Sequence, residues 1–84
     1  MTRRYVLQKS ADGSTDWLEE IEVWSQRARK RLEWDIMKNE TGYTVRLTID
    51  GSHVPVVGAG NSPRSAKVNL VQQVDRAEPA ILTI

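Results

Sequence analysis

The chain has 84 residues, of which 39% are hydrophobic and 27% charged, a balance typical of one small folded domain and not of a disordered tail. It contains no cysteine, which excludes a disulfide framework, a thiolate metal site and a thiol nucleophile, and its formal charge of +1 is too small to indicate a polyanionic partner by itself. No apolar run is long enough for a membrane span, and the first residues lack a secretion signal, so we expect an intracellular protein, cytoplasmic or nuclear, with no membrane partner.

The first helix is predicted over residues 17–30. It follows an arm in which residues 3–9 are a candidate short strand and residues 11–14 a turn. Asp16 is expected to cap the helix through its carboxylate, with Glu19 in the reciprocal position three residues later. Four apolar side chains share one arc and form the predicted core face: Trp17, Ile21, Trp24 and Ala28.

Three strands are predicted next, because the hydrophobic period changes to two. The first alternates through Leu32, Trp34 and Ile36, and a turn at residues 39–42 leads into the second. The second strand has the clearest pattern, with four alternating apolar residues: Tyr43, Val45, Leu47 and Ile49. Asp50-Gly51 suits a tight hairpin turn with positive φ at both residues, so residues 53–57 are expected to pair alongside.

The second helix is predicted to begin after Ser62, with Pro63 at its first position, and to end near Glu78-Pro79. Its core face comprises Ala66, Leu70, Val71, Val74 and Ala77. The order helix, three-stranded antiparallel meander, helix predicts an α+β domain with both helices on one face of the sheet. We expect one domain over residues 1–84, with a core at about 16–78, an arm at 1–15 that can add an N-terminal strand, and a tail at 79–84.

Several motifs of this chain recur together in one known family. The third strand leads through Gly58-Ala-Gly60-Asn-Ser62 into Pro-Arg64-Ser-Ala66-Lys67. Residues 18–26 form a first helix with Gln26 near its end, Trp34 is an aromatic in the first strand, and Glu40-Thr41-Gly42 precedes the second strand. On these residues the chain, from about 17 to 77, resembles the double-stranded RNA-binding domain family. In that family a Gly-x-Gly-x-Ser turn runs into a helix opening Ser-Lys-Lys-x-Ala-Lys.

The chain also departs from this family. Gly42 passes directly to Tyr43, where members that bind well usually carry Gly-Pro-x-His, so the loop is shortened and its histidine is missing. Pro63 replaces the first lysine of the basic pair, and Leu70 and Val71 replace small alanines. These departures predict that affinity for RNA is either reduced or lost.

The resemblance implies a non-catalytic module that reads the shape of double-stranded RNA, contacting two minor grooves and the phosphates between them. The residues it assigns to RNA are Glu22, Gln26, Arg29, Lys38, Asn39, Ser62, Arg64 and Lys67. The start of the second helix is the favoured phosphate site, because free backbone N–H groups and two cations meet there.

Each of these assignments has a purely structural alternative. Ser62 can simply start the helix, Arg64 and Lys67 can be solvated charges, and the polar face of the first helix looks the same without a ligand. Lys38 and Asn39, with Thr41, are expected in the short first loop, where polar residues are common. The basic run at residues 27–31 is a candidate nucleic-acid or import patch, and its alternative is that cations in the last turn favour the helix dipole.

No catalytic chemistry is predicted. His53 has no cysteine partner, serine motif or metal-ligand spacing around it, so we expect no enzyme activity, metal, cofactor or small-molecule substrate. The three tryptophans are predicted to be buried packing residues and not stacking platforms.

Two other functions remain open. The first is a protein-interaction or dimerisation module with the same fold and a lost RNA face, using apolar ends at residues 3–9 or 81–84 for strand addition. The second is a ribosome-bound protein resembling hibernation factors, which add an N-terminal strand to the same order of elements.

Overall fold

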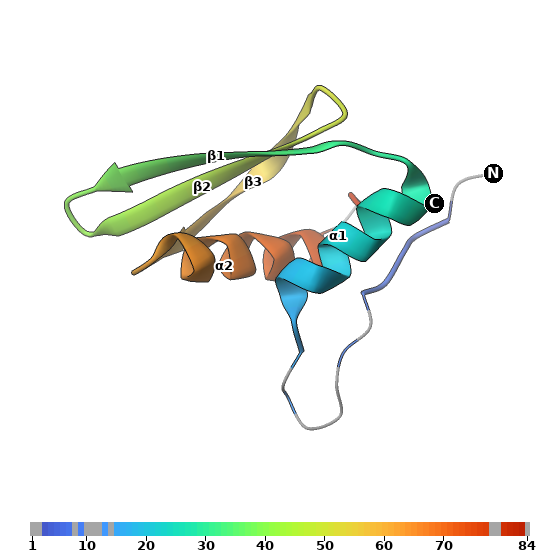
Figure 1. The fold of residues 1–84 in the computed structure, drawn as a ribbon, viewed down its shortest axis with the longest axis horizontal. Helices are drawn as coiled ribbons and strands as arrows, with labels where there is room; N and C mark the ends of the chain where they lie inside the picture. Colours follow the sequence, from blue (N-terminus) through green and yellow to red (C-terminus); the bar gives the residue numbers. More distant parts are fainter. Residues whose placement is uncertain (1–2, 8, 10–12, 14, 78–79, 84) are drawn as a thin grey trace.

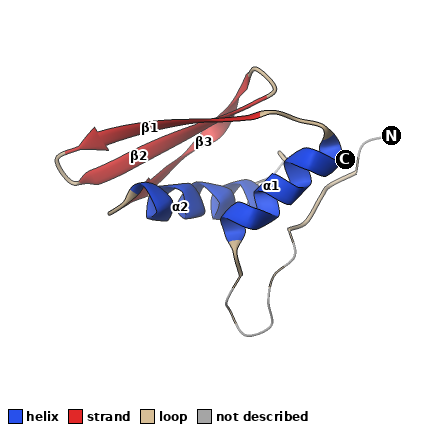
Figure 2. Ribbon diagram, in the orientation of Figure 1, coloured by secondary structure: helices blue, strands red, loops and turns tan. Residues whose placement is uncertain are grey.

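The computed structural model describes residues 3–7, 9, 13, 15–77 and 80–83. Its elements are α1 (Trp17–Ala28), β1 (Leu32–Asn39), β2 (Gly42–Ile49), β3 (Ser52–Gly60) and α2 (Pro63–Arg76). The strands form one antiparallel sheet in the order β1-β2-β3, and both helices lie on one side of it (Figures 1 and 2). The predicted α+β fold with α-β-β-β-α order is therefore confirmed. Neither helix in the described part of the chain is long and apolar enough to cross a membrane.

Helix α1 begins as predicted and ends earlier. The Asp16 carboxylate accepts a hydrogen bond of 3.2 Å from the backbone N–H of Glu19. The helix ends at Ala28 and not at Lys30, because Arg29 adopts the left-handed conformation with φ of 56°. The N–H of Lys30 then turns back to the carbonyl of Ser25 at 2.9 Å, which closes the helix end.

Both hairpins have short turns, and the ladder of the first extends farther than predicted. Asp50 and Gly51 have φ of 54° and 87°, so the predicted tight turn between β2 and β3 is confirmed. Strands β1 and β2 pair without interruption as far as Asn39 opposite Gly42. The prediction that Lys38 and Asn39 lie in the first loop is therefore wrong, because the ladder continues through both residues.

The two glycines before α2 allow β3 to approach that helix closely. A Cβ atom at Gly58 would lie 2.6 Å from the Leu70 Cβ and would overlap the Ala66 carbonyl oxygen, and one at Gly60 would lie 2.6 Å from the Ala66 nitrogen. No real side chain fits at such distances. The Ser62 hydroxyl then accepts from the Ser65 N–H at 3.1 Å, with Pro63 opening the helix as predicted.

One hydrophobic core joins the helices, the sheet and both ends of the chain. Its buried members are Leu7, Ile21, Trp24, Val45, Leu47, Ala66, Leu70, Val71, Val74 and Leu82. Trp24 is buried as predicted, but Trp17 and Trp34 are only half-buried and Ile36 is 41% exposed. The reason for Trp34 and Ile36 is that α2 packs mainly against β3 and β2, which leaves edge strand β1 partly uncovered.

The described part of the arm pairs with the tail and not with the sheet. Arg4 forms an isolated antiparallel bridge with Thr83, and the Tyr5 N–H donates to the Leu82 carbonyl at 2.9 Å. Leu7 and Leu82 are each 1% exposed, so the expectation of free apolar ends is wrong for these two residues. The predicted turn at residues 11–14 apart from Gly13, the stop at Glu78-Pro79, and Ile84 lie outside the described residues.

The arm is held in place by a buried carboxylate on α2. Asp75, 8% exposed, forms an ion pair of 2.7 Å with the Lys9 ammonium group. The other carboxylate oxygen accepts from the Leu7 N–H at 3.2 Å, and the backbone carbonyl of Asp75 accepts from the Arg4 guanidinium group at 3.1 Å. The arm is thereby fastened to the end of α2.

Candidate nucleic-acid interface

The structure divides the predicted RNA-binding residues between two regions. The β1–β2 turn and the start of α2 lie at one end of the molecule, and the end of α1 lies at the other, beside the β2–β3 turn (Figure 1). Five of the predicted residues belong to the first end: Lys38, Asn39, Ser62, Arg64 and Lys67. The other three lie along α1 and just beyond it: Glu22, Gln26 and Arg29.

The start of α2 carries an exposed cation that lacks a local counter-charge. Arg64 lies in the first turn, which contains no acidic residue, and it forms no ion pair within the described part of the chain. A cation at a helix N-terminus faces the positive end of the helix dipole, which is unfavourable in the absence of an anion. An anion bound here would be attracted by the guanidinium group and by the free N–H groups together.

Ser62 at the same site has a structural task. Its hydroxyl accepts from the Ser65 N–H at 3.1 Å and donates to the Ser65 hydroxyl at 3.0 Å. Both hydrogen-bonding roles of this hydroxyl are thus used inside the helix cap, which favours the structural interpretation of Ser62.

Lys67 does not act beside Arg64 as an equivalent cation. Its ammonium group lies 5.2 Å from the centroid of the Trp34 ring, on the side of α2 that faces β1. Arg64 instead lines a shallow hollow with Ala59 of β3. The ammonium group of Lys67 thus makes a cation–π contact with the half-buried Trp34, so this lysine is engaged with β1 as well as being a charge at the edge of the interface.

The β1–β2 turn is braced by Asn39. Its amide donates to the Thr44 hydroxyl at 2.9 Å, and its oxygen accepts from the Thr41 N–H at 3.0 Å and the Thr41 hydroxyl at 2.9 Å. Asn39 therefore shapes the turn, which is the structural alternative. Lys38 next to it is exposed and has no ion-pair partner among the described residues.

The outer face of α1 is polar and acidic. Glu22 and Gln26 are exposed one helical turn apart, and Glu19 and Glu20 lie in the first turn. Arg29 is exposed in the left-handed cap, beyond the last helical residue. This face has groups that can hydrogen-bond to ribose hydroxyls, but its carboxylates would repel the phosphates of a nearby RNA backbone.

The basic run at residues 27–31, which begins in the last turn of α1, has local partners. Arg27 donates to the Tyr5 hydroxyl at 3.4 Å, Lys30 lies 3.7 Å from the Asp50 carboxylate, and Arg31 lies 3.4 Å from Glu33. All these pairs are exposed, so each contributes little to stability. Three of the four cations in the run thus have partners within the protein, so the run does not by itself indicate a nucleic-acid site.

One feature of the interface region has no counterpart in the sequence predictions. Asn69 accepts from the Ala59 N–H at 3.1 Å, and Gln73 donates to the Val57 carbonyl at 2.8 Å and to Asn69 at 2.9 Å. These α2 side chains cover the outward backbone groups of edge strand β3. Two amides spaced four residues apart on a helix are the only sequence signal for this contact, and such spacing is common on exposed helix faces.

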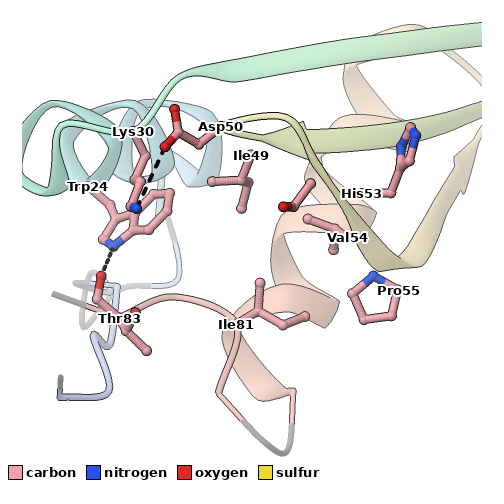
Figure 3. A pocket seen from close by; sticks show the side chains of 10 residues that line it. Trp24, Lys30, Ile49, Asp50, His53, Val54, Pro55, Ile81 and Thr83 are labelled. Atoms are coloured by element: carbon pink, nitrogen blue, oxygen red, sulfur yellow. Dashed lines mark hydrogen bonds and ion pairs between the residues drawn. The ribbon is translucent and has the colours of Figure 1, made fainter.

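The hollow at the other end of the molecule, about 310 Å³ in volume, lies between the β2–β3 turn and the tail (Figure 3). Trp24 and His53 lie on opposite sides of it, and its polar groups are mostly paired. The Trp24 indole N–H donates to the Thr83 carbonyl at 3.1 Å, and His53 shares a hydrogen bond of 3.1 Å with the Thr48 hydroxyl. Within the described residues no three His, Asp or Glu side chains converge as metal ligands would.

Comparisons of the chain with models of known protein families, with curated proteins and with solved structures found no match. The class of the protein is therefore given by its fold, an α+β domain of α-β-β-β-α order with an open three-stranded antiparallel sheet. Its function is inferred from the geometry described above.

Proposed function

We propose that this chain is a non-catalytic domain, a divergent relative of the double-stranded RNA-binding family, that binds duplex RNA by shape. The observation that carries the proposal is Arg64, an exposed cation without an acidic neighbour in the first turn of α2. A helix start of this kind binds phosphate, and A-form RNA presents phosphates on both sides of a groove too narrow for side chains to enter.

The other predicted residues take unequal parts in this proposal. Lys67 and Lys38 add positive charge near the start of α2, whereas Ser62 and Asn39 position the backbone of the two turns. Glu22, Gln26 and Arg29 are assigned to ribose hydroxyls and phosphates farther along the duplex. Because the outer face of α1 is acidic, we expect weak binding that is indifferent to base sequence and sensitive to salt.

The second alternative function depended on the arm. A fold resembling the hibernation factors would use residues 3–9 as an additional strand of the sheet. The described part of the arm instead bridges Thr83 of the tail, so no observation favours this alternative over RNA binding.

The test is a titration of the protein against a labelled RNA duplex of about 20 base pairs, which exceeds the roughly 16 that such domains span. A DNA duplex of the same sequence is titrated in parallel, each at low and at moderate salt. We expect tighter binding to RNA than to DNA and a loss of affinity as salt rises.

Arg64→Ala should weaken RNA binding and lower the salt slope by about one. Arg46→Ala is the matched control, because Arg46 is an exposed cation on the sheet face opposite the helices, between buried Val45 and Leu47. Equal effects of the two substitutions, or equal affinity for DNA and RNA, would contradict the proposal.

A further inference from the structure

The two edges of the sheet are treated differently by the rest of the chain. The edge of β3 is covered by Asn69 and Gln73, and β3 also contains Pro55, which cannot donate to a further strand. On the edge of β1, no side chain in the described part of the molecule bonds to the outward backbone groups. Natural sheets usually protect such an edge, and a long regular one that stays open is a site for strand addition.

Strand β1 is suited to that addition. It runs from Leu32 to Asn39 without bulge or proline, and the Asp50 N–H to Arg31 carbonyl bond of 2.8 Å continues its ladder with β2. In an antiparallel ladder alternate residues turn their backbone groups outward, and here these are the even-numbered ones. The exposed apolar side chains Ile36 and Met37, 41% and 55% exposed, lie on this same strand.

We propose that two copies of the chain pair through their β1 edges, antiparallel and about a twofold axis at Ile36, forming one continuous sheet with three strands from each copy. Even-numbered residues must then lie opposite even-numbered ones. In this register Ile36 faces Ile36, Trp34 faces Lys38 of the second copy, and Asp35 faces Met37. No like charges lie directly opposite each other.

Three other positions of the twofold axis are less favourable, because they set like charges opposite each other or leave more of β1 unpaired. An axis at Asp35 sets this carboxylate against itself, and an axis at Trp34 sets Glu33 against Asp35 twice. Like charges directly opposite each other in a sheet are destabilising. An axis at Met37 avoids this conflict but leaves the β1 residues before Asp35 unpaired. The axis at Ile36 is therefore selected, because it avoids like charges opposite each other and keeps more of β1 paired than the axis at Met37 does.

The dimer does not need RNA, although Lys38 belongs to both surfaces, and it has a different response to salt. Lys67 already lies over the Trp34 ring, and Lys38 of the second copy approaches the same residue. Salt would screen these two cations from each other, so added salt should not weaken the dimer. RNA binding, in contrast, weakens as salt rises.

The first experiment is sedimentation equilibrium of the full chain over a range of concentrations, without RNA. We expect the apparent mass to rise from 9.5 kDa toward twice that value. Ile36→Lys should abolish the rise, because two lysines would then meet on the axis. Val57→Lys is the matched control, since Val57 has the same 41% exposure but lies on the covered edge, and it should still dimerise.

Circular dichroism shows whether each variant remains folded, as expected for substitutions of exposed side chains. A wild-type mass that stays at 9.5 kDa up to about 1 mM overturns the proposal. Equal dissociation of the folded Ile36→Lys and Val57→Lys variants overturns it as well.

Disulfide trapping tests the register, because the chain has no cysteine of its own. In Ile36→Cys the two Cα atoms would be about 5.5 Å apart, a distance that a disulfide spans, so oxidation should give a covalent dimer. In Met37→Cys they would be about 8 Å apart and should crosslink poorly. Preferential crosslinking of Met37→Cys would overturn the axis at Ile36.

Discussion

Replacing Gly58 by alanine tests how closely β3 approaches α2. The added Cβ atom would lie 2.6 Å from the Leu70 Cβ and would overlap the backbone oxygen of Ala66, which cannot rotate away. Overpacking of this kind costs about 3 kcal/mol. Alanine also lowers the entropy of the unfolded chain, which offsets about 1 kcal/mol. We therefore expect a net loss of about 2 kcal/mol and a fall in Tm of roughly 8 to 16 °C.

The assay is thermal and urea unfolding followed by circular dichroism. Ala59→Val is the control, because the neighbouring Ala59 is exposed and adding methyl groups there should change stability by less than about 0.5 kcal/mol. If Gly58→Ala unfolds within about 0.5 kcal/mol of the wild type, the close approach of β3 to α2 is not a constraint in solution. Glycine would then not be required at position 58.

Two further substitutions test contacts made across the fold. Asp75→Ala removes the partner of Lys9 and of the Leu7 N–H, and because the Lys9 side chain is 43% exposed we expect a loss of about 2 kcal/mol in urea unfolding. Asp75→Asn, which keeps an acceptor, should lose less, and an equal loss would argue against the hydrogen bond. Asn69→Ala with Gln73→Ala uncovers the β3 edge and should lower stability by only about 1 kcal/mol. When this double substitution is made in the monomeric Ile36→Lys variant, light scattering should show new self-association through the β3 edge. Unchanged scattering would mean that these amides do not protect the edge.

Much of the fold was predictable because its signals are local. Asp16 and Ser62 cap helices through bonds to residues three positions away, and Asp50-Gly51 makes a turn within its own backbone. The alternation through Val45 and Leu47 records directly which side of β2 is buried. Each of these features depends on a few neighbouring residues, so the chain itself contains the necessary information.

The candidate site was only partly predictable for the opposite reason. The sequence shows that Arg64 and Lys67 are three positions apart at a helix start. It does not show that Lys67 lies over Trp34 of strand β1. It also did not indicate that the ladder runs through Lys38 and Asn39, because a two-residue turn and a longer loop have similar composition. Side-chain direction depends on which element lies alongside, and that is a tertiary property.

The sequence by itself determined the order of helices and strands, their caps and turns, and the buried faces of α2 and β2. Only the tertiary structure decided that the arm joins the tail and that Asp75 fastens the arm. It also decided that one sheet edge is covered while the other, as far as the described residues show, stays open. These contacts join residues far apart in the chain, such as Leu7 and Asp75 at a separation of 68. No period or local hydrogen bond records such a contact, because it forms only when the packed core brings the two segments together.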